Sequence, residues 1–136
     1  MFFTKVGFVL GKRIFKPWIA CAAVALLCLS APMAQAQTLM TEEELLATIP
    51  GSSISSKTDK GVRWAQNYGK AKGKRKGAIK GVFDGTQYDA KWYVENGLWC
   101  EDWGDGQACW SVERVDAKSL RMYVDGKPRP NLWKLK

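Results

Sequence analysis

The sequence predicts a mainly β fold: an antiparallel meander or small barrel of about seven or eight strands, with one short helix before it. After Ser52, short runs of β-branched and aromatic residues are separated by glycine-containing turns. Several of these turns carry the Asp-Gly or Asn-Gly pair that suits a tight hairpin. In the exported part of the chain, only the segment before Pro50 has a helix signal. Closure into a barrel would remove the exposed edges of the sheet.

The helix signal begins at Thr41, which three glutamates and two leucines follow. The Thr41 hydroxyl and the Glu44 carboxylate suit a capping box, and acidic side chains suit the positive end of a helix dipole. Pro50 disfavours helical dihedrals at Ile49. We therefore expect a short helix that starts at Thr41 and ends by Thr48.

Eight short runs predict the strands. Each run contains residues typical of strands and ends at a turn signal. Because the connecting turns are short, we expect successive strands to be antiparallel neighbours. Pro128 and Pro130 would make the last run an edge strand or a cover. The predicted strands are residues 53–56, 62–68, 78–83, 87–94, 98–103, 108–115, 119–124 and 132–135.

Residues 91–115 hold two cysteines and four tryptophans, and they predict three strands joined by two tight turns. Asn96-Gly97 suits a type I′ turn, which needs a positive φ at both central residues. A two-residue loop at this position places Glu101 opposite Trp92. The first turn therefore sets the register of the first two strands.

The second turn has two possible positions, and they differ in where they place the cysteines. A Gly104-Asp105 loop sets Cys100 directly opposite Cys109, whereas an Asp105-Gly106 loop sets Cys100 opposite Ser111. The first register suits a disulfide better. We expect Cys100 and Cys109 to form a structural disulfide with no redox function.

The first register also divides the side chains between two faces, because side chains alternate along a strand. The tryptophan face is expected to be the core, since a small β domain must bury large side chains. Trp103 lies beside the turn and is the best candidate for a contact residue on a rim. Glu101 falls on the same face, either at the edge of the core or at a polar pocket. That face carries Trp92, Val94, Trp99, Trp103, Trp110 and Val112.

The other two tryptophans of the exported part are Trp64 and Trp133. Exposed tryptophans can stack on sugar rings or nucleobases, which is the alternative to core packing. Because a domain of this size needs its large side chains for stability, we expect both residues in the core.

Residues 1–36 have the pattern of a secretory signal peptide. Four basic residues precede an apolar run at residues 18–29, and an Ala-Gln-Ala cleavage site precedes Gln37. The run has about a dozen residues, short of the roughly 20 that span a bilayer, so a retained anchor is the weaker interpretation. A lipoprotein is rejected because Leu27 precedes Cys28, where small residues are usual, and Cys21 has too little apolar chain before it.

Cleavage would leave residues 37–136 as a single exported β domain, periplasmic or secreted. It would remove four basic residues and no acidic one, so that 17 basic residues against 13 acidic ones leave a net charge of +4. Cys100 and Cys109 would be its two cysteines, and an oxidising compartment favours their pairing. Closing so short a loop stabilises a domain by roughly 2 to 3 kcal/mol.

From about Leu39 to the end, the chain resembles a family of small exported proteins of Gram-negative bacteria that is classed as a domain of unknown function. The resemblance lies in the segment Lys91 to Cys100 (KWYVENGLWC), followed by Ala108-Cys109-Trp110, and in the short helix that ends at Pro-Gly. The chain departs from the family in the lysine-rich stretch after Tyr68. The resemblance implies the fold and export, and it brings no activity or catalytic residue.

Catalytic chemistry has little support. The chain has no histidine, which removes the commonest general base and the usual nucleophile pairs, and paired cysteines leave no thiolate. Two cysteines without histidine do not fill a tetrahedral zinc site, so we expect no metal and no cofactor. The remaining chemistry is that of carboxylates, two of which a glycosidase needs at a set spacing. The candidates are Glu95, Glu101, Asp102 and Asp105, of which Asp102 and Asp105 are expected to be turn residues.

A basic cluster lies in the glycine-bounded loop at residues 69–77, which carries no aromatic residue. Such a loop is either a solvated turn or a flexible patch that attracts anions by charge alone. An anionic partner in the envelope would be lipopolysaccharide, an acidic polysaccharide or an acidic protein, and nucleic acid ranks last. The candidate anion-binding residues are Lys70, Lys72, Lys74, Arg75 and Lys76.

Three classes of function follow from the sequence. The leading one is a monomeric, non-enzymatic binding or interaction module for an anionic envelope partner. The second is a structural or accessory envelope protein. The third is a carboxylate-based hydrolase of glycans, which would show a concave pocket with two close carboxyls.

Overall fold

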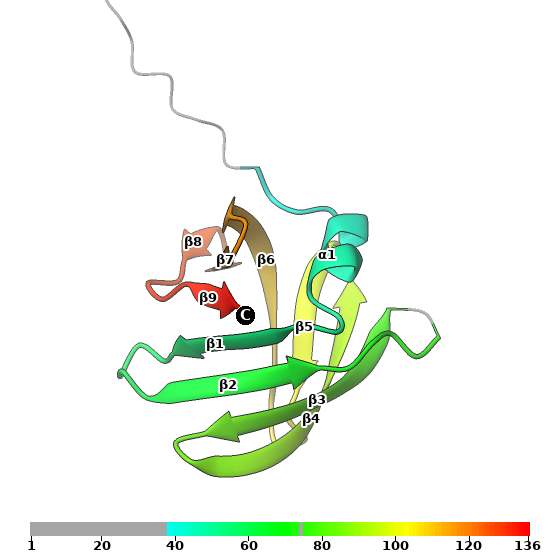
Figure 1. The fold of residues 1–136 in the computed structure, drawn as a ribbon. Coiled ribbons are helices and arrows are strands. Elements are labelled where there is room, and N and C mark those ends of the chain that lie inside the picture. Colours follow the sequence, from blue (N-terminus) through cyan, green and yellow to red (C-terminus); the bar gives the residue numbers. More distant parts are fainter. Residues whose placement is uncertain (1–37, 74) are drawn as a thin grey trace, which may run out of the picture. The chain divides into compact units, whose positions relative to one another are not determined.

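The computed structural model describes residues 38–73 and 75–136, which form a closed antiparallel barrel of eight strands with one short helix (Figure 1). The predicted fold class is confirmed. The predicted signal peptide, Gln37 and Lys74 lie outside the described residues. The elements are α1 (Glu42–Thr48), β1 (Ser53–Lys57), β2 (Arg63–Tyr68), β3 (Lys76–Phe83), β4 (Thr86–Glu95), β5 (Leu98–Asp102), β6 (Gln107–Asp116), β7 (Ser119–Val124), β8 (Lys127–Pro128) and β9 (Trp133–Leu135).

Helix α1 has the predicted capping box. The Glu44 backbone N–H donates to Thr41 Oγ1 at 3.3 Å, and the Thr41 N–H donates to Glu44 Oε2 at 2.7 Å. Leu45 and Ile49 are fully buried in the core of the barrel. Glu42 accepts a hydrogen bond from the Gly97 N–H in the β4–β5 turn. The helix therefore covers the end of the barrel where β4 ends (Figure 1).

The barrel is a meander that its last strand closes. Strands β1 to β7 pair with their neighbours in sequence, and β9 returns between β7 and β1. The prediction that Pro128 and Pro130 make the last run an edge or cover is wrong for β9. Both prolines precede β9, so its backbone N–H groups remain able to pair on two sides. Pro128 lies in the short β8, which pairs with β7.

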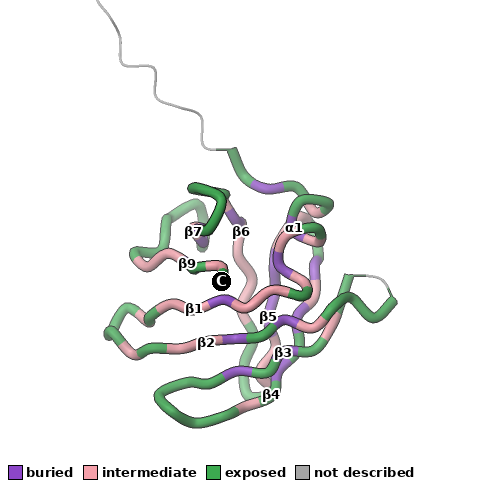
Figure 2. The backbone as a smooth tube through the Cα atoms, viewed as in Figure 1, coloured by how far each residue is buried: buried purple, intermediate pink, exposed green. Residues whose placement is uncertain are grey.

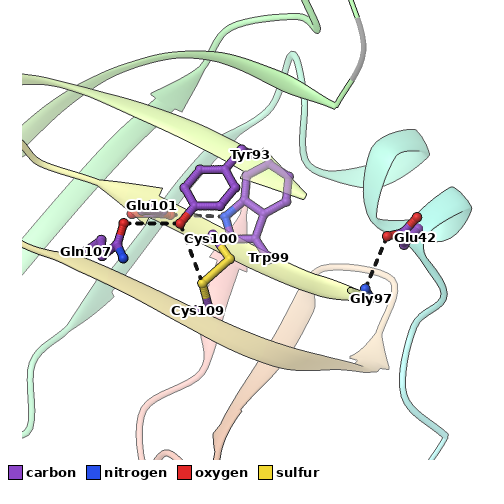
Figure 3. The surroundings of a disulfide bond; sticks show 8 residues. All are labelled: Glu42, Tyr93, Gly97, Trp99, Cys100, Glu101, Gln107 and Cys109. Carbon is purple, nitrogen blue, oxygen red and sulfur yellow. Dashed lines mark hydrogen bonds between the residues drawn. A yellow bond between two sulfur atoms is a disulfide. The ribbon is translucent and has the colours of Figure 1, made fainter. Parts of the chain in front are cut away.

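Both central turns follow the predicted geometry. Asn96 and Gly97 have φ values of 51° and 75°, as a type I′ turn requires. The second turn is the Gly104-Asp105 loop, and it sets Cys100 directly opposite Cys109. The two cysteines form a disulfide on the outer side of the barrel wall (Figure 3).

Alternate residues of each strand face the barrel interior, so buried and exposed positions alternate along the strands (Figure 2). Strand β3 contributes two glycines to this face, each directly opposite an aromatic residue of β4. A Cβ atom on Gly77 would lie 2.5 Å from Trp92 Nε1, and one on Gly81 would lie 2.2 Å from Tyr88 Cζ. The two glycines therefore make room for these rings.

Candidate functional site

The two ends of the barrel differ. Helix α1 covers one end, while the opposite end, at the β1–β2 and β5–β6 turns, opens into a cavity of about 960 Å³. Figure 1 shows the helix on the other side of the barrel from the β1–β2 and β3–β4 turns. A cavity of this size lies in the range typical of small-molecule sites. The open end is therefore the candidate site.

Four tryptophans from four strands or their ends form the wall of this cavity. The ring of Trp133 lies 5.1 Å from that of Trp64 and 5.4 Å from that of Trp110, both edge to face. Trp110 in turn lies 6.2 Å from Trp103, again edge to face. Trp133 is buried and the other three are partly exposed. The wall thus presents aromatic surface to the cavity while the rings also pack against one another.

The floor of the cavity is a hydrogen-bonded ring centred on Glu101, which is 1% exposed. Tyr68 Oη contacts Glu101 Oε1 at 2.6 Å, and Trp99 Nε1 donates to the same oxygen at 3.2 Å. Gln66 Nε2 donates to Glu101 Oε2 at 2.9 Å. Tyr68 Oη also contacts Gln66 Oε1, which completes the ring.

The number of protons available to this ring indicates whether Glu101 is protonated. Tyr68 Oη meets two oxygens, Gln66 Oε1 and Glu101 Oε1, with one hydroxyl proton. If Glu101 is protonated it donates to Tyr68, Tyr68 donates to Gln66, and every contact in the ring has a proton. An ionised Glu101 would leave one oxygen–oxygen contact without a proton. The ring therefore favours the neutral acid.

Burial acts in the same direction. It raises the pKa of Glu101, although the hydrogen bonds from Tyr68, Gln66 and Trp99 partly oppose the rise. Burial and the nearby Glu101 raise the pKa of Tyr68 well above its usual value. Burial also raises the pKa of Tyr88, another residue that lines the cavity, to about 12. Geometry and burial therefore both favour a floor that is polar and uncharged.

The sequence located part of this floor. The predicted register of Glu101, opposite Trp92, is confirmed. The sequence left two places open for this side chain, the edge of the core or a polar pocket, and in the structure it lies on the floor of the cavity. Sequence reasoning missed Gln66 and Tyr68 as its partners. The available signal was spacing, because both residues share the inner face of β2 with Trp64.

The rim combines charged and apolar side chains. Arg129 Nη2 lies 2.6 Å from Asp59 Oδ2 and forms a salt bridge at the mouth. Lys57, Lys60 and Asp105 are further charged residues that line the cavity. Two large apolar side chains are exposed there, Phe83 at 45% and Val124 at 37%.

The predicted anion-binding residues lie away from this cavity. Lys70 and Lys72 are exposed in the β2–β3 connection and Lys76 is exposed at the start of β3, at the end of the barrel that α1 covers. Arg75 Nη2 lies 2.9 Å from Glu42 Oε2 of α1, so this residue is engaged in a salt bridge.

The other predicted residues divide between the two faces of the barrel. Trp103 lines the cavity, as a rim residue would. Asp102, the last residue of β5, accepts a hydrogen bond from the Gly104 N–H at 2.8 Å, so its side chain caps the β5–β6 turn. On the outer face, Tyr93 Oη lies 3.9 Å from Cys109 Sγ of the disulfide (Figure 3).

Comparison of the chain with protein-family models, with curated proteins and with solved structures finds no match. The resemblance to a family of small exported proteins stays a prediction. Within the part of the chain that the structure describes, no helix is long and apolar enough to cross a membrane.

Proposed function

We propose that this protein is a non-enzymatic binding module that takes a small molecule with an apolar or aromatic body into the tryptophan-lined cavity. The observation that carries the proposal is an open cavity of about 960 Å³ walled by four tryptophans. Aromatic rings left facing open space lose packing contacts that a ligand would restore. The proposal includes the predicted periplasmic or secreted location, where the protein would meet its ligand.

The alternative of a glycan hydrolase has weaker support. Glu101 is held on the floor by three side chains, so it is poorly placed to move toward a substrate. The other carboxylates that line the cavity, Asp59 and Asp105, are exposed rim residues. A hydrolase needs two carboxyls on opposite sides of one bond. The geometry therefore favours binding over hydrolysis.

The test is to fill the cavity from its wall. Ala108 lines the cavity, and Ala108→Phe would place a ring in it, whereas Ala78→Phe makes the same change at an exposed position of β3. The probe is N-phenyl-1-naphthylamine, an uncharged aromatic dye whose fluorescence rises in apolar sites. We expect Ala108→Phe to weaken dye binding at least about tenfold and Ala78→Phe to leave it unchanged. Equal affinity of both variants would refute the proposal.

A second candidate function is the predicted one, an anion-binding patch on the β2–β3 connection. The observation in its favour is that Lys70, Lys72 and Lys76 are exposed and lie at the opposite end of the barrel from the cavity. Arg75 is less available because it pairs with Glu42. The partner would be lipopolysaccharide, an acidic polysaccharide or an acidic protein, attracted by charge.

A further inference from the structure

The charges at the mouth of the cavity leave an excess of positive charge. Three cations and two exposed carboxylates line the mouth. Arg129 and Asp59 pair with each other at 2.6 Å, which leaves two lysines, Lys57 and Lys60, against one exposed carboxylate, Asp105, among the described residues of the lining. Neither lysine takes part in a salt bridge among the described residues, and both are exposed.

The floor offers no charge to a ligand. Glu101 is 1% exposed, and its two oxygens already contact Tyr68, Trp99 and Gln66. The proton count of the ring favours the neutral form of this acid. A ligand cation that reached this floor would therefore meet a protonated acid whose oxygens are already hydrogen-bonded, and not a free carboxylate.

The apolar surface begins at the mouth and continues inward. Exposure falls from Phe83 and Val124 at the rim, through three partly buried tryptophans, to the buried Trp133 and Glu101. A molecule that enters with its apolar part first gains contact along the whole path. A charged head group would then remain at the rim, in water and beside the lysines.

From this gradient we infer that the ligand is an amphipathic organic anion, with its apolar body between the tryptophans and its anionic head beside Lys57 and Lys60. The inference rests on the proposed function of the cavity. Carboxylate, sulfate and phosphate heads share the required chemistry, and a medium-chain carboxylate is the simplest example.

The experiment compares three probes that share a ten-carbon chain and differ in the charge of the head: decanoate, decanol and decyltrimethylammonium. Each probe displaces N-phenyl-1-naphthylamine from the purified protein at low ionic strength, below its micelle concentration. We expect decanoate to bind about five to ten times more tightly than decanol, as two exposed lysines would provide, and the cation to bind most weakly. Added salt should shrink this preference, because it screens exposed charges.

The control is a pair of double variants with the same change in net charge. Lys57→Gln with Lys60→Gln should reduce the preference for decanoate over decanol, measured within the same variant, to about twofold or less. Lys91→Gln with Lys118→Gln removes two exposed lysines that do not line the cavity, and it should retain the preference.

The outcomes separate the two proposals. Failure of the dye to bind at all would refute the proposed function itself. Dye binding with equal affinity for decanoate and decanol would leave the cavity as a binding site and overturn the anion inference. Tightest binding of decyltrimethylammonium would also overturn it, because the tryptophan rings or a carboxylate of the lining would then be the receptor for a cation.

Discussion

Glu101 shows how a single residue defines the inner face of this barrel. Its position in β5 is one where the strand places buried side chains, next in the alternation to Trp99 and Trp103. An ionised acid would be costly there without a cation beside it. The ring with Tyr68 and Gln66 removes that cost by favouring the protonated form. The floor of the cavity is therefore built from an acid that behaves as a neutral hydrogen-bonding group.

The first prediction concerns the pH dependence of stability. Burial raises the pKa of Glu101 above its ordinary value of 4.5, so between these two values the folded protein holds a proton that the unfolded chain has lost. The free energy of unfolding should therefore fall as the pH rises through this window and level off above the raised pKa. Glu101→Gln should lack this contribution, because glutamine carries no titrating proton.

The amide that Glu101→Gln introduces can also keep the hydrogen-bonded ring intact. If the Gln66 amide turns over, its nitrogen donates to Tyr68 Oη, and its oxygen accepts from the nitrogen of the new amide. The oxygen of the new amide then accepts from Tyr68 and Trp99, so each polar group keeps a partner. The free energy of unfolding of Glu101→Gln should thus lie within about 1 kcal/mol of that of the parent near pH 4. Toward pH 8 the variant should become more stable than the parent, because only the parent loses stability as the pH rises.

The measurement is urea unfolding of both proteins across this pH range, with Glu95→Gln as the control at an exposed position of β4. A difference between the parent and Glu101→Gln that stays constant with pH would contradict a raised pKa for the buried acid.

At the scale of elements, the pairing of β3 with β4 depends on two glycines that face two aromatic rings. Gly77 is opposite Trp92 and Gly81 is opposite Tyr88. Trp92 is fully buried and also stacks on Trp99 at 4.9 Å between ring centroids, so its ring has no room to move. Tyr88 is only partly buried. The two glycines therefore differ in how much a side chain would disturb the barrel.

The second prediction follows from this contact. Gly77→Ala should lower the free energy of unfolding by about 1 to 3 kcal/mol, the usual cost of overpacking a core. Gly106→Ala is the control, because a Cβ atom there meets nothing within 4 Å and no positive φ is involved. It should stay within about 0.5 kcal/mol of the parent. Chemical denaturation checks both, and equal stability of the two variants would show that Trp92 can yield.

The third prediction concerns the β2–β3 connection. Replacing Lys70, Lys72, Lys74 and Lys76 by glutamine, while Arg75 keeps its salt bridge with Glu42, should weaken retention on heparin or lipopolysaccharide. Stability should change by less than about 1 kcal/mol, since exposed charges contribute little to folding. Unchanged retention at low salt would leave the connection as a solvated turn.

Local chemistry explains which elements the sequence could predict. The Thr41 capping box, the Asn96-Gly97 turn and the register of Cys100 with Cys109 depend on residues close together in sequence. The cavity depends on contacts between distant segments. Gln66 bonds with Glu101 across 35 positions, and the alternation of β2 places Gln66 on the inner face without indicating its partner.

The role of β9 could not be predicted from the sequence for the same reason. The prolines before β9 suggested an edge, and its pairing with β1 depends on closure of the whole barrel. From the sequence, Trp133 is predicted only as one more core residue. Its contacts with Trp64 and Trp110 exist only in the closed ring.

For the whole molecule, the barrel separates stability from binding in space. The disulfide between Cys100 and Cys109 lies on the outer face of β5 and β6, whereas the cavity lies on the inner face. Leu45 of α1 and Ile49, the residue that caps the end of this helix, fill one end. The open end can therefore present aromatic surface without weakening the rest of the core.

The fourth prediction tests this separation. Replacing Cys100 and Cys109 together by serine should lower the free energy of unfolding by about 2 to 3 kcal/mol, because the short loop is no longer closed covalently. Binding of N-phenyl-1-naphthylamine should change by less than about twofold under conditions where the variant is folded. Denaturation and dye titration of the same samples provide both measurements. Loss of dye binding in a folded variant would show that the disulfide shapes the cavity.

The position of β9 has a consequence for the order of events during synthesis. This strand forms two residue pairs with β1 and two with β7, and it follows all the other strands in the chain. Until Trp133 to Leu135 have left the ribosome, β1 lacks a partner on one edge and β7 is paired on its facing edge only by the short β8, so the ring cannot close. Closure must therefore follow synthesis of every other strand. A chain that stops before Trp133 would remain an open sheet, and its unpaired strand edges would be prone to pair with strands of other chains.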